Sequence, residues 1–250
     1  MSKKLFDDWL EVAQSTANNV TLFQERSGSR AVGLDAFKEL LADHFVGEEV
    51  VLKMGGYEKA ATTLKNSLPA LTKTRSGDLG ELLATEYVDA RTTFRVPFRK
   101  LRWKSDRQMP MHGNDIIAVE VRGASVHVLK GESKSRSRFT PSHFAEAAKG
   151  LDEHNGRPNP STLAFITKRL YELNRDKEAK VFEELQVNGA VPDRNIEHLI
   201  FALAGQDPST QLAGAPQPKN SVIKRGGAAV MVSDHAEFIE AVYTSHVNKP

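Results

Sequence analysis

The order of hydrophobic and polar residues divides the chain into a first part with helical spacing and a second part of mixed character. Residues 5–73 carry apolar side chains three or four positions apart, as at Phe37, Leu40 and Leu41, so we expect mostly helices there. From Thr92 onward the apolar side chains recur every second residue, which is typical of strands.

The second part alternates strands with helices. The expected elements are a helix over 78–90, one long bent strand over 94–104, strands over 115–121 and 126–134, a helix from Thr140–Pro141 to about 153, an extended segment or helix start at 161 that leads into a charged helix ending near 185, a buried strand over 196–204, a long loop over 205–227, a short strand over 228–232 and a helix over 234–246. This order predicts an α/β fold with a central mixed sheet flanked by helices. We expect residues 1–75 to form a helical N-terminal region and residues 76–250 to form the main domain.

Composition excludes several chemistries. The chain of 250 residues has no cysteine, which removes disulfides, thiolate metal sites and a cysteine nucleophile. Its 34 basic and 32 acidic residues give a net charge of +2, so a nucleic-acid surface would have to be local. We find no apolar run long enough for a membrane helix and no signal peptide, and we expect a cytoplasmic protein.

The clearest chemical signal joins Asp115 to the triplet Glu132-Ser133-Lys134. If Gly123-Ala124 is the two-residue loop of a type II′ hairpin, residue i pairs with residue 247 − i. Asp115 then lies directly opposite Glu132, and both side chains point to the same face. Lys134 joins that face because it lies two residues further along the strand.

Two opposed carboxylates repel each other unless a cation neutralises them. Mg²⁺ is a suitable cation because it takes carboxylates and water and leaves room for phosphate oxygens. A site holding Asp115, Glu132 and Lys134 could therefore hydrolyse a phosphodiester. The alternative is an exposed cluster in which Lys134 only pairs with the two acids.

Other titratable residues lie near this hairpin in the sequence. Glu81 is expected in the first turns of a helix and matters only if that helix points it at the same metal. Glu86 and Asp89 on the same helix are expected to be solvated. His112 is close enough in sequence to reach the site and His143 begins the next helix, although structural roles suit both.

A run of basic residues precedes the hairpin and a second group follows it. The candidates for contact with a nucleic-acid backbone are Arg99, Lys100, Arg102, Arg136 and Arg138. Arg136 and Arg138 are the stronger candidates because they continue the face of Glu132 and Lys134. The alternative for the first run is a solvated edge strand whose charges prevent aggregation.

Three segments together resemble a known family. The order of Glu81, Asp115 and Glu132-Ser133-Lys134 on helix, strand and strand is similar to that of the PD-(D/E)xK restriction-endonuclease-like superfamily, although Asn114 replaces the proline. More closely, the segments GDLGELLATEYV, GNDIIAV and GESKSR resemble the HamA family, the nuclease-like subunits of the Hachiman anti-phage defence system, to which the defence protein AbpA is related. The resemblance spans roughly residues 75–250.

The resemblance implies more than the residues do. It implies a restriction-endonuclease-like core, DNA cleavage that depends on Mg²⁺ with Mn²⁺ as a substitute, and a superfamily 2 helicase partner similar to HamB. It assigns metal binding to Asp115 and Glu132, an accessory ligand role to Glu81, and orientation of the attacking water to Lys134. The alternatives are an inactive scaffold that binds DNA and the helicase, or a nuclease of DNA repair or resolution.

Overall fold

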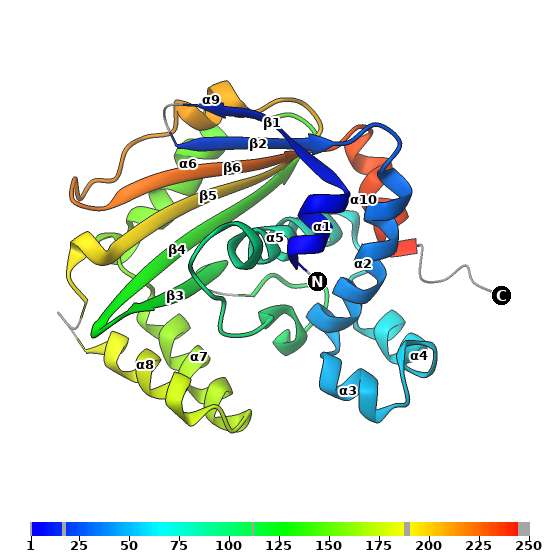
Figure 1. The fold of residues 1–250 in the computed structure, drawn as a ribbon, viewed down its shortest axis with the longest axis horizontal. Coiled ribbons are helices and arrows are strands. Elements are labelled where there is room, and N and C mark those ends of the chain that lie inside the picture. Colours follow the sequence, from blue (N-terminus) through cyan, green and yellow to red (C-terminus); the bar gives the residue numbers. More distant parts are fainter. Residues whose placement is uncertain (1, 17–18, 112, 188–190, 245–250) are drawn as a thin grey trace.

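A single six-stranded sheet organises the molecule (Figure 1). The computed structural model describes residues 2–16, 19–111, 113–187 and 191–244, and no helix in these ranges is long and apolar enough to cross a membrane. The strands, in their order across the sheet, are β1 (Leu10–Thr16), β2 (Val20–Glu25), β6 (Lys224–Met231), β5 (Ile196–Ala204), β4 (Ser125–Arg136) and β3 (Ile116–Arg122). The four inner strands run parallel, and each outer strand is antiparallel to its neighbour.

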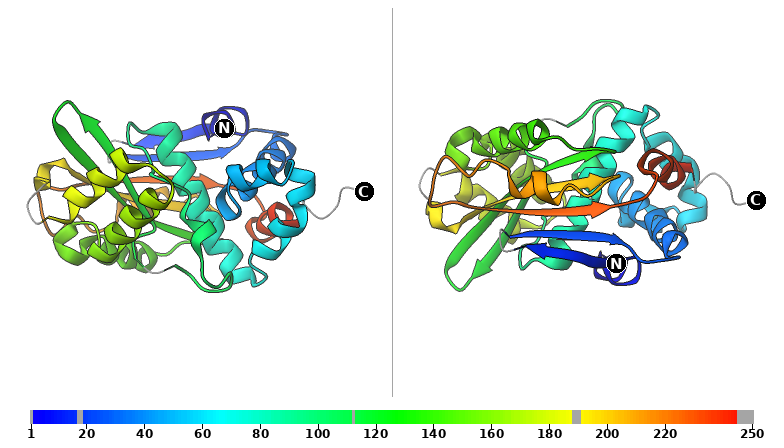
Figure 2. Two further views of the ribbon diagram at one scale, coloured as in Figure 1. Left: turned by 90° about the horizontal axis from the view of Figure 1, so that it is seen from below. Right: turned by 90° about the horizontal axis from the view of Figure 1, so that it is seen from above.

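Helices cover both faces of this sheet, as the two views of Figure 2 show. The first face is covered by α1 (Ser2–Asp8), α2 (Arg30–Phe45), α5 (Thr72–Arg91) and α10 (His235–Thr244), with α3 (Glu48–Lys53) and α4 (Tyr57–Ser67) beyond α2. The second face is covered by α6 (Pro141–Asp152), α7 (Pro160–Glu172), α8 (Asp176–Gln186) and α9 (Ser209–Ala213). Three short 3₁₀ helices, Lys100–Trp103, Glu153–Gly156 and Asp193–Asn195, complete the described elements. The expected mixed sheet flanked by helices is therefore confirmed.

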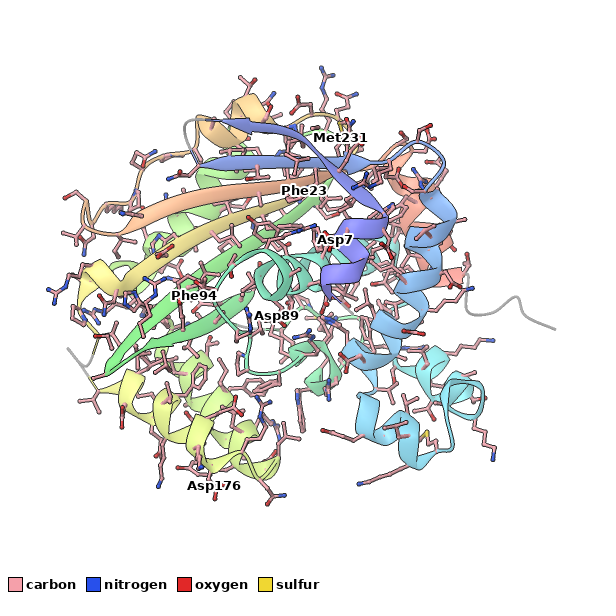
Figure 3. All side chains as sticks on the ribbon, in the orientation of Figure 1. Asp7, Phe23, Asp89, Phe94, Asp176 and Met231 are labelled. Carbon is pink, nitrogen blue, oxygen red and sulfur yellow. The ribbon has the colours of Figure 1, made fainter. Side chains whose placement is uncertain are left out.

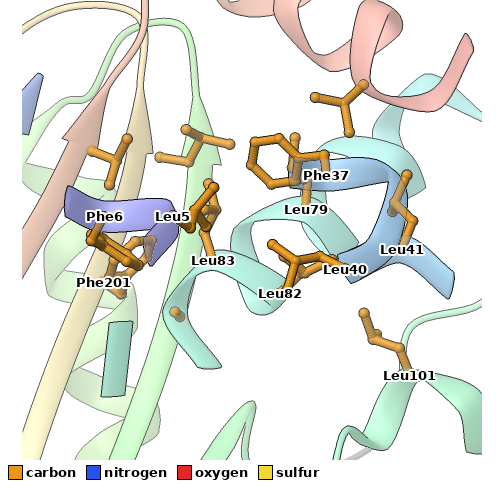
Figure 4. Packing of buried hydrophobic residues seen from close by; sticks show 14 of the residues in the cluster. Leu5, Phe6, Phe37, Leu40, Leu41, Leu79, Leu82, Leu83, Leu101 and Phe201 are labelled. Atoms are coloured by element: carbon orange, nitrogen blue, oxygen red, sulfur yellow. The ribbon is translucent and has the colours of Figure 1, made fainter. Parts of the chain in front are cut away.

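The largest core joins the N-terminal elements to the sheet. Helix α5 is its centre, because Leu79, Leu82 and Leu83 are fully buried between neighbouring elements (Figure 4). Figure 4 shows Phe37 of α2 on one side of these leucines and Phe6 of α1 on the other. The first 70 residues thus share one hydrophobic core with α5 and the strands.

The prediction of a mostly helical segment over 5–73 is wrong at its beginning. Residues 10–16 form β1 and residues 20–25 form β2, and β2 pairs with β6 in the sheet. The error came from taking Leu5, Trp9 and Val12 as one helical face, whereas α1 ends at Asp8 and Val12 is 58% exposed. Short apolar patterns fit a helix or a strand equally well until a neighbouring strand is known.

The prediction of one long strand over 94–104 is also wrong. Only Arg95 makes a β-bridge there, with Val119, and residues 100–103 form a 3₁₀ helix. The alternating pattern arose because Phe94, Phe98 and Leu101 are buried while Arg99 and Lys100 between them form ion pairs. Alternation of burial does not require a strand when the segment lies in a groove between other elements.

Most of the second part follows the sequence closely. Strand β5 has the predicted bounds, and β3, β4, α6 and α10 lie within two residues of the prediction at most ends. The predicted long loop over 205–227 contains the short helix α9 and the first residues of β6. The charged helix that was predicted to end near 185 is two helices, α7 and α8.

Candidate active site

The β3–β4 hairpin has the register that the sequence predicted. The chain turns through Gly123 and Ala124, and the pairing continues without a shift to the start of β3. Gly123 has φ +61°, the left-handed conformation that a type II′ turn needs at its first central position. Asp115 directly precedes the first pair of this register, Ile116 with Gly131.

Glu132 and Lys134 lie on the face of β4 that α6 covers. A Cβ atom built on Gly150 of α6 would lie 3.4 Å from the carboxyl carbon of Glu132. The Lys134 ammonium lies 3.4 Å from Glu146, also on α6. Glycine at position 150 thus leaves space for the Glu132 carboxylate under the helix, and Glu132 and Lys134 share this face of β4.

Lys130, two residues before Glu132, holds the far end of α6 in place. Its side chain is fully buried, and its ammonium donates hydrogen bonds to the carbonyls of Leu151 at 2.9 Å and Glu153 at 3.0 Å. A cation is favourable at the C-terminus of a helix. This contact fixes the position of α6 over the hairpin and therefore the space around Glu132.

Asp115 is positioned by the segment before β3. Gly113 has φ +94°, and a Cβ atom there would lie 2.2 Å from the hydroxyl of Thr162, so only glycine fits. That hydroxyl accepts a hydrogen bond from the Asn114 amide at 3.1 Å. The Asp115 carboxylate accepts a hydrogen bond of 2.9 Å from the backbone of Ser133, which holds it across the end of the hairpin.

Glu81 approaches the same place from the opposite face of the sheet. It lies in the middle of α5, which begins at Thr72, so the expectation that it occupies the first turns of a helix is wrong. A Cβ atom on Gly80 would be 3.0 Å from the Ser133 hydroxyl oxygen, so glycine permits α5 to pack closely on β4. Because β3 begins only at Ile116, the edge of β4 is open there and Glu81 reaches past it.

Lys100 joins the site, a placement that no local pattern in the sequence indicates. Its ammonium lies 3.2 Å from Glu81 Oε1 and donates a 2.8 Å hydrogen bond to the Asn114 carbonyl. Burial lowers the pKa of Lys100, but the charges of Glu81 and Asp115 outweigh that effect and the net shift is upward. We call Glu81, Lys100, Asp115, Glu132 and Lys134 the Asp115 cluster.

The Asp115 cluster holds more acidic charge than its lysines balance. Burial is the main cause that raises the pKa of Glu132 to about 8, and the Asp115 carboxylate raises it too. Burial likewise raises the pKa of Glu81 to about 7, despite the opposing charge of Lys100. A cation bound among these carboxyl groups would favour their ionised forms and lower both pKa values.

Arg99 and Arg102, predicted to contact nucleic acid, lie in a neighbouring set of ion pairs. Arg99 binds Glu86 at 2.9 Å and Asp89 at 2.7 Å, and Arg102 binds Asp43 at 3.0 Å. Asp89 is labelled near the centre of Figure 3. Both guanidinium groups are already engaged inside the protein.

Glu86 also accepts a 2.8 Å hydrogen bond from the buried His44 of α2, so the expectation that Glu86 is solvated is wrong. Burial lowers the pKa of His44, which keeps the imidazole neutral and able to donate. We call this group the His44 cluster; it consists of Asp43, His44, Glu86, Asp89, Arg99 and Arg102. It connects α2, α5 and the segment before the 3₁₀ helix.

Arg136 and Arg138 differ from these paired arginines. Both are exposed at the end of β4, and neither has an acidic partner within ion-pair distance in the described ranges. His143 accepts a 3.1 Å hydrogen bond from the Thr140 amide at the start of α6, a structural role, and His112 lies outside the described residues.

The carboxylate oxygens of the Asp115 cluster are suitable ligands for a hard divalent cation that keeps most of its bound water. Asp115 and Glu132 supply two neighbouring carboxylates, and the buried Glu81 carboxylate has Lys100 as its ion-pair partner at 3.2 Å. Among the described residues no three acidic or histidine side chains close around one point. Two carboxylates with several waters is an arrangement that Mg²⁺ commonly adopts.

The fold and its acidic hairpin define a mixed α/β protein compatible with a nuclease-like core. The chain belongs to the HamA family, whose model matches residues 3–245. It is similar to a protein of Bacillus cereus named Hachiman protein HamA, with 27% identity over 157 residues. The match covers 63% of this chain and 55% of that relative, so it spans about half of the relative's length.

Proposed function

We propose that this chain is a metal-dependent deoxyribonuclease that acts in a Hachiman-type anti-phage defence system. The observation that carries the proposal is the meeting of Asp115, Glu132 and Lys134 at one end of a single hairpin. A purely structural hairpin has no need of two opposed carboxylates, because their repulsion is unfavourable. Membership of the HamA family supports the defence role.

Each residue of the Asp115 cluster has a role in this proposal. Asp115 and Glu132 would hold Mg²⁺, or Mn²⁺ in its place, with Glu81 as an accessory ligand and the Ser133 carbonyl as a further contact. The cation supplies positive charge beside the phosphate oxygens and lowers the pKa of bound water. Lys134 orients the attacking water and stabilises the negative charge that develops on the phosphate.

Arg136 and Arg138 bind the DNA backbone in this proposal. They are exposed and follow the site on the same strand, so a duplex that contacts them passes over Glu132 and Lys134. Their contacts are with phosphates and are therefore independent of sequence.

A superfamily 2 helicase is the proposed partner, and the N-terminal region is the proposed docking or shielding element. Removing that region is not a clean test, because Leu5, Phe6 and Leu64 belong to the main core. Co-expression of the full chain with a superfamily 2 helicase from the same genome, followed by co-purification, tests the partnership directly. Recovery of the chain without the helicase would contradict it.

Cleavage of plasmid and linear DNA by the purified chain, with Mg²⁺ or with EDTA, tests the nuclease proposal. We expect cleavage with Mg²⁺ and none with EDTA. Glu132→Ala and Lys134→Ala should each lower the rate by about a thousandfold, because groups that act as a unit fail together. Glu184→Ala on the exposed face of α8 is the matched control and should cleave normally.

Folding of each variant is checked by its melting temperature. Full cleavage by folded Glu132→Ala would exclude this site as the nuclease centre. DNA binding without cleavage by the wild-type chain, alone and with the helicase, would favour the inactive scaffold instead.

A further inference from the structure

A cavity of about 340 Å³ opens next to the Asp115 cluster. Its walls come from residues between 96 and 111, from residues 114–117, from Thr85 of α5 and from α7. Lys100 and Asp115 line it, so the cavity and the proposed cleavage site share a wall. A volume of this order suits a small organic group rather than a single water molecule or ion.

Three aromatic side chains form part of the cavity wall. They are Phe98, Trp103 and Phe165. The Phe98 ring lies 6.4 Å from that of Trp103 and 6.0 Å from that of Phe165, with both pairs steeply inclined to each other. Rings held at an angle in this way leave their faces available to a flat ligand.

Polar side chains lie in the same wall as these rings. They include Lys104 and Asn114, beside Lys100 and Asp115. The Arg169 guanidinium, which does not line the cavity, lies 4.4 Å from the centre of the Trp103 ring and 5.3 Å from that of Phe165 and holds the two rings in place.

We propose that this cavity receives an unpaired nucleobase of the DNA strand that is cleaved at the Asp115 cluster. The inference rests on the proposed nuclease function and adds a preference for substrates with an unpaired nucleotide. Stacking on aromatic side chains binds bases without reading their sequence, and an enzyme gains access to a base by turning it out of the helix. The shared wall places the phosphate of that nucleotide beside Lys100 and Asp115.

An apolar side chain of a partner protein is the competing occupant. Aromatic-lined grooves also accept such anchors. The nucleobase is favoured because the cavity is continuous with the acidic site through Lys100 and Asp115, so an occupant of the cavity lies beside the cleaved strand. A protein anchor would not require that continuity.

The test uses the full chain in EDTA, so that DNA is bound without cleavage. The probes are a duplex with one unpaired thymidine and the same duplex with an abasic nucleotide at that position. We expect about tenfold to a hundredfold tighter binding of the thymidine bulge, which is the range for stacking of one base. The abasic bulge has the same backbone and therefore controls for phosphate contacts.

Tryptophan fluorescence reports occupancy of the cavity directly. The chain has two tryptophans, and Trp9 is fully buried in the other core. The thymidine bulge should quench Trp103, whereas the abasic bulge should not. Quenching should disappear in Trp103→Phe.

Phe165→Ala is the decisive variant, and Tyr171→Ala on the same helix is its matched control. Phe165 lines the cavity and is only half-buried, whereas Tyr171 is exposed and does not line it. Phe165→Ala should bind both bulges with equal affinity, and Tyr171→Ala should keep the preference.

The outcomes separate the two proposals. Equal binding of both bulges by a wild-type chain that cleaves plasmid would overturn the nucleobase inference and leave the nuclease intact. Loss of helicase co-purification by Phe165→Ala, with the bulge preference unchanged, would identify a protein anchor as the occupant. Absence of both DNA binding and cleavage would overturn both proposals together.

Discussion

The Asp115 cluster and the His44 cluster are built from the same two elements and have opposite character. Helix α5 contributes Glu81 to the first and Glu86 to the second. The adjacent residues Lys100 and Arg99 are the cations that pair with these acids. The two acids thus lie less than two turns apart on α5, and the two cations are consecutive residues of the 94–104 segment.

The two clusters have the same formal charges, three carboxyl groups and two basic side chains, but the acids of the His44 cluster are paired more closely. Glu86 and Asp89 bind Arg99 at 2.9 and 2.7 Å, Asp43 binds Arg102 at 3.0 Å, and the neutral His44 donates a hydrogen bond to Glu86. In the Asp115 cluster Lys100 lies 3.2 Å from Glu81, Lys134 lies 3.4 Å from Glu146 of α6, and the pKa values of Glu81 and Glu132 rise to about 7 and about 8. The first arrangement stabilises the fold, whereas the second leaves Glu132 without a close ion pair among the described residues.

The largest expected difference between the two clusters is in how the loss of one acid changes the free energy of unfolding. Glu86→Gln removes the fully buried carboxylate that pairs with Arg99 and accepts from His44, and should lower the free energy of unfolding by about 3 kcal/mol even though Arg99 keeps Asp89. Glu132→Gln removes a buried acid from beside Asp115 and should leave the stability unchanged or raise it in metal-free buffer. Urea unfolding at pH 7.5 in EDTA measures both. Equal losses would show that the Asp115 cluster is also structural.

Replacing the two adjacent cations should separate the clusters by their response to Mg²⁺. Lys100→Met should lower the free energy of unfolding by about 1–3 kcal/mol in EDTA, because Glu81 loses its buried partner. Added Mg²⁺ should restore that loss, since a ligand that binds only the native state stabilises it. The Arg99→Met variant should also be less stable than the wild-type chain, but Mg²⁺ should not restore its stability. Melting temperatures with and without Mg²⁺ give the answer, and restoration of both variants would contradict the comparison.

Acid pH should act on the His44 cluster through its imidazole. Burial holds the pKa of His44 below its usual 6.5 in the folded chain, so below that pH the unfolded chain binds a proton that the native chain does not. The free energy of unfolding should therefore fall as the pH drops below about 6.5 and stay level above it. His44→Gln keeps a donor for Glu86 but does not titrate, so its slope should be shallower, by up to about 1.4 kcal/mol per pH unit. Parallel slopes for the two proteins would refute this assignment.

The smallest effect concerns the exposed arginines that follow the Asp115 cluster. Arg136→Ala combined with Arg138→Ala should weaken DNA binding and reduce the slope of log affinity against log salt by about 0.9 per lost phosphate contact. Stability should not change, in contrast to Arg99→Met. Lys177→Ala combined with Lys180→Ala on α8 removes the same charge elsewhere and serves as the control. An equal change in salt slope for the control pair would mean that only net charge matters.

The sequence alone determined the hairpin and its chemistry. A two-residue loop beginning with glycine sets the register of its own strands, because no other part of the chain enters that geometry. The hairpin register therefore predicted that Asp115, Glu132 and Lys134 lie close together. The helix after Thr140–Pro141 could be assigned from local sequence signals. Membership of the HamA family was likewise indicated by short segments around these residues.

Only the tertiary structure decided the contacts between distant segments. Strands β1 and β2 exist because β6, some 200 residues later, offers an edge to pair with. Lys100 enters the Asp115 cluster while Arg99 enters the His44 cluster, a choice set by how the 94–104 segment crosses α5 and not by either residue's neighbours. The aromatic cavity likewise forms only where that segment meets α7. Local patterns specify pairings across a short loop, whereas the partner of a buried charge depends on the packing of elements far apart in the chain.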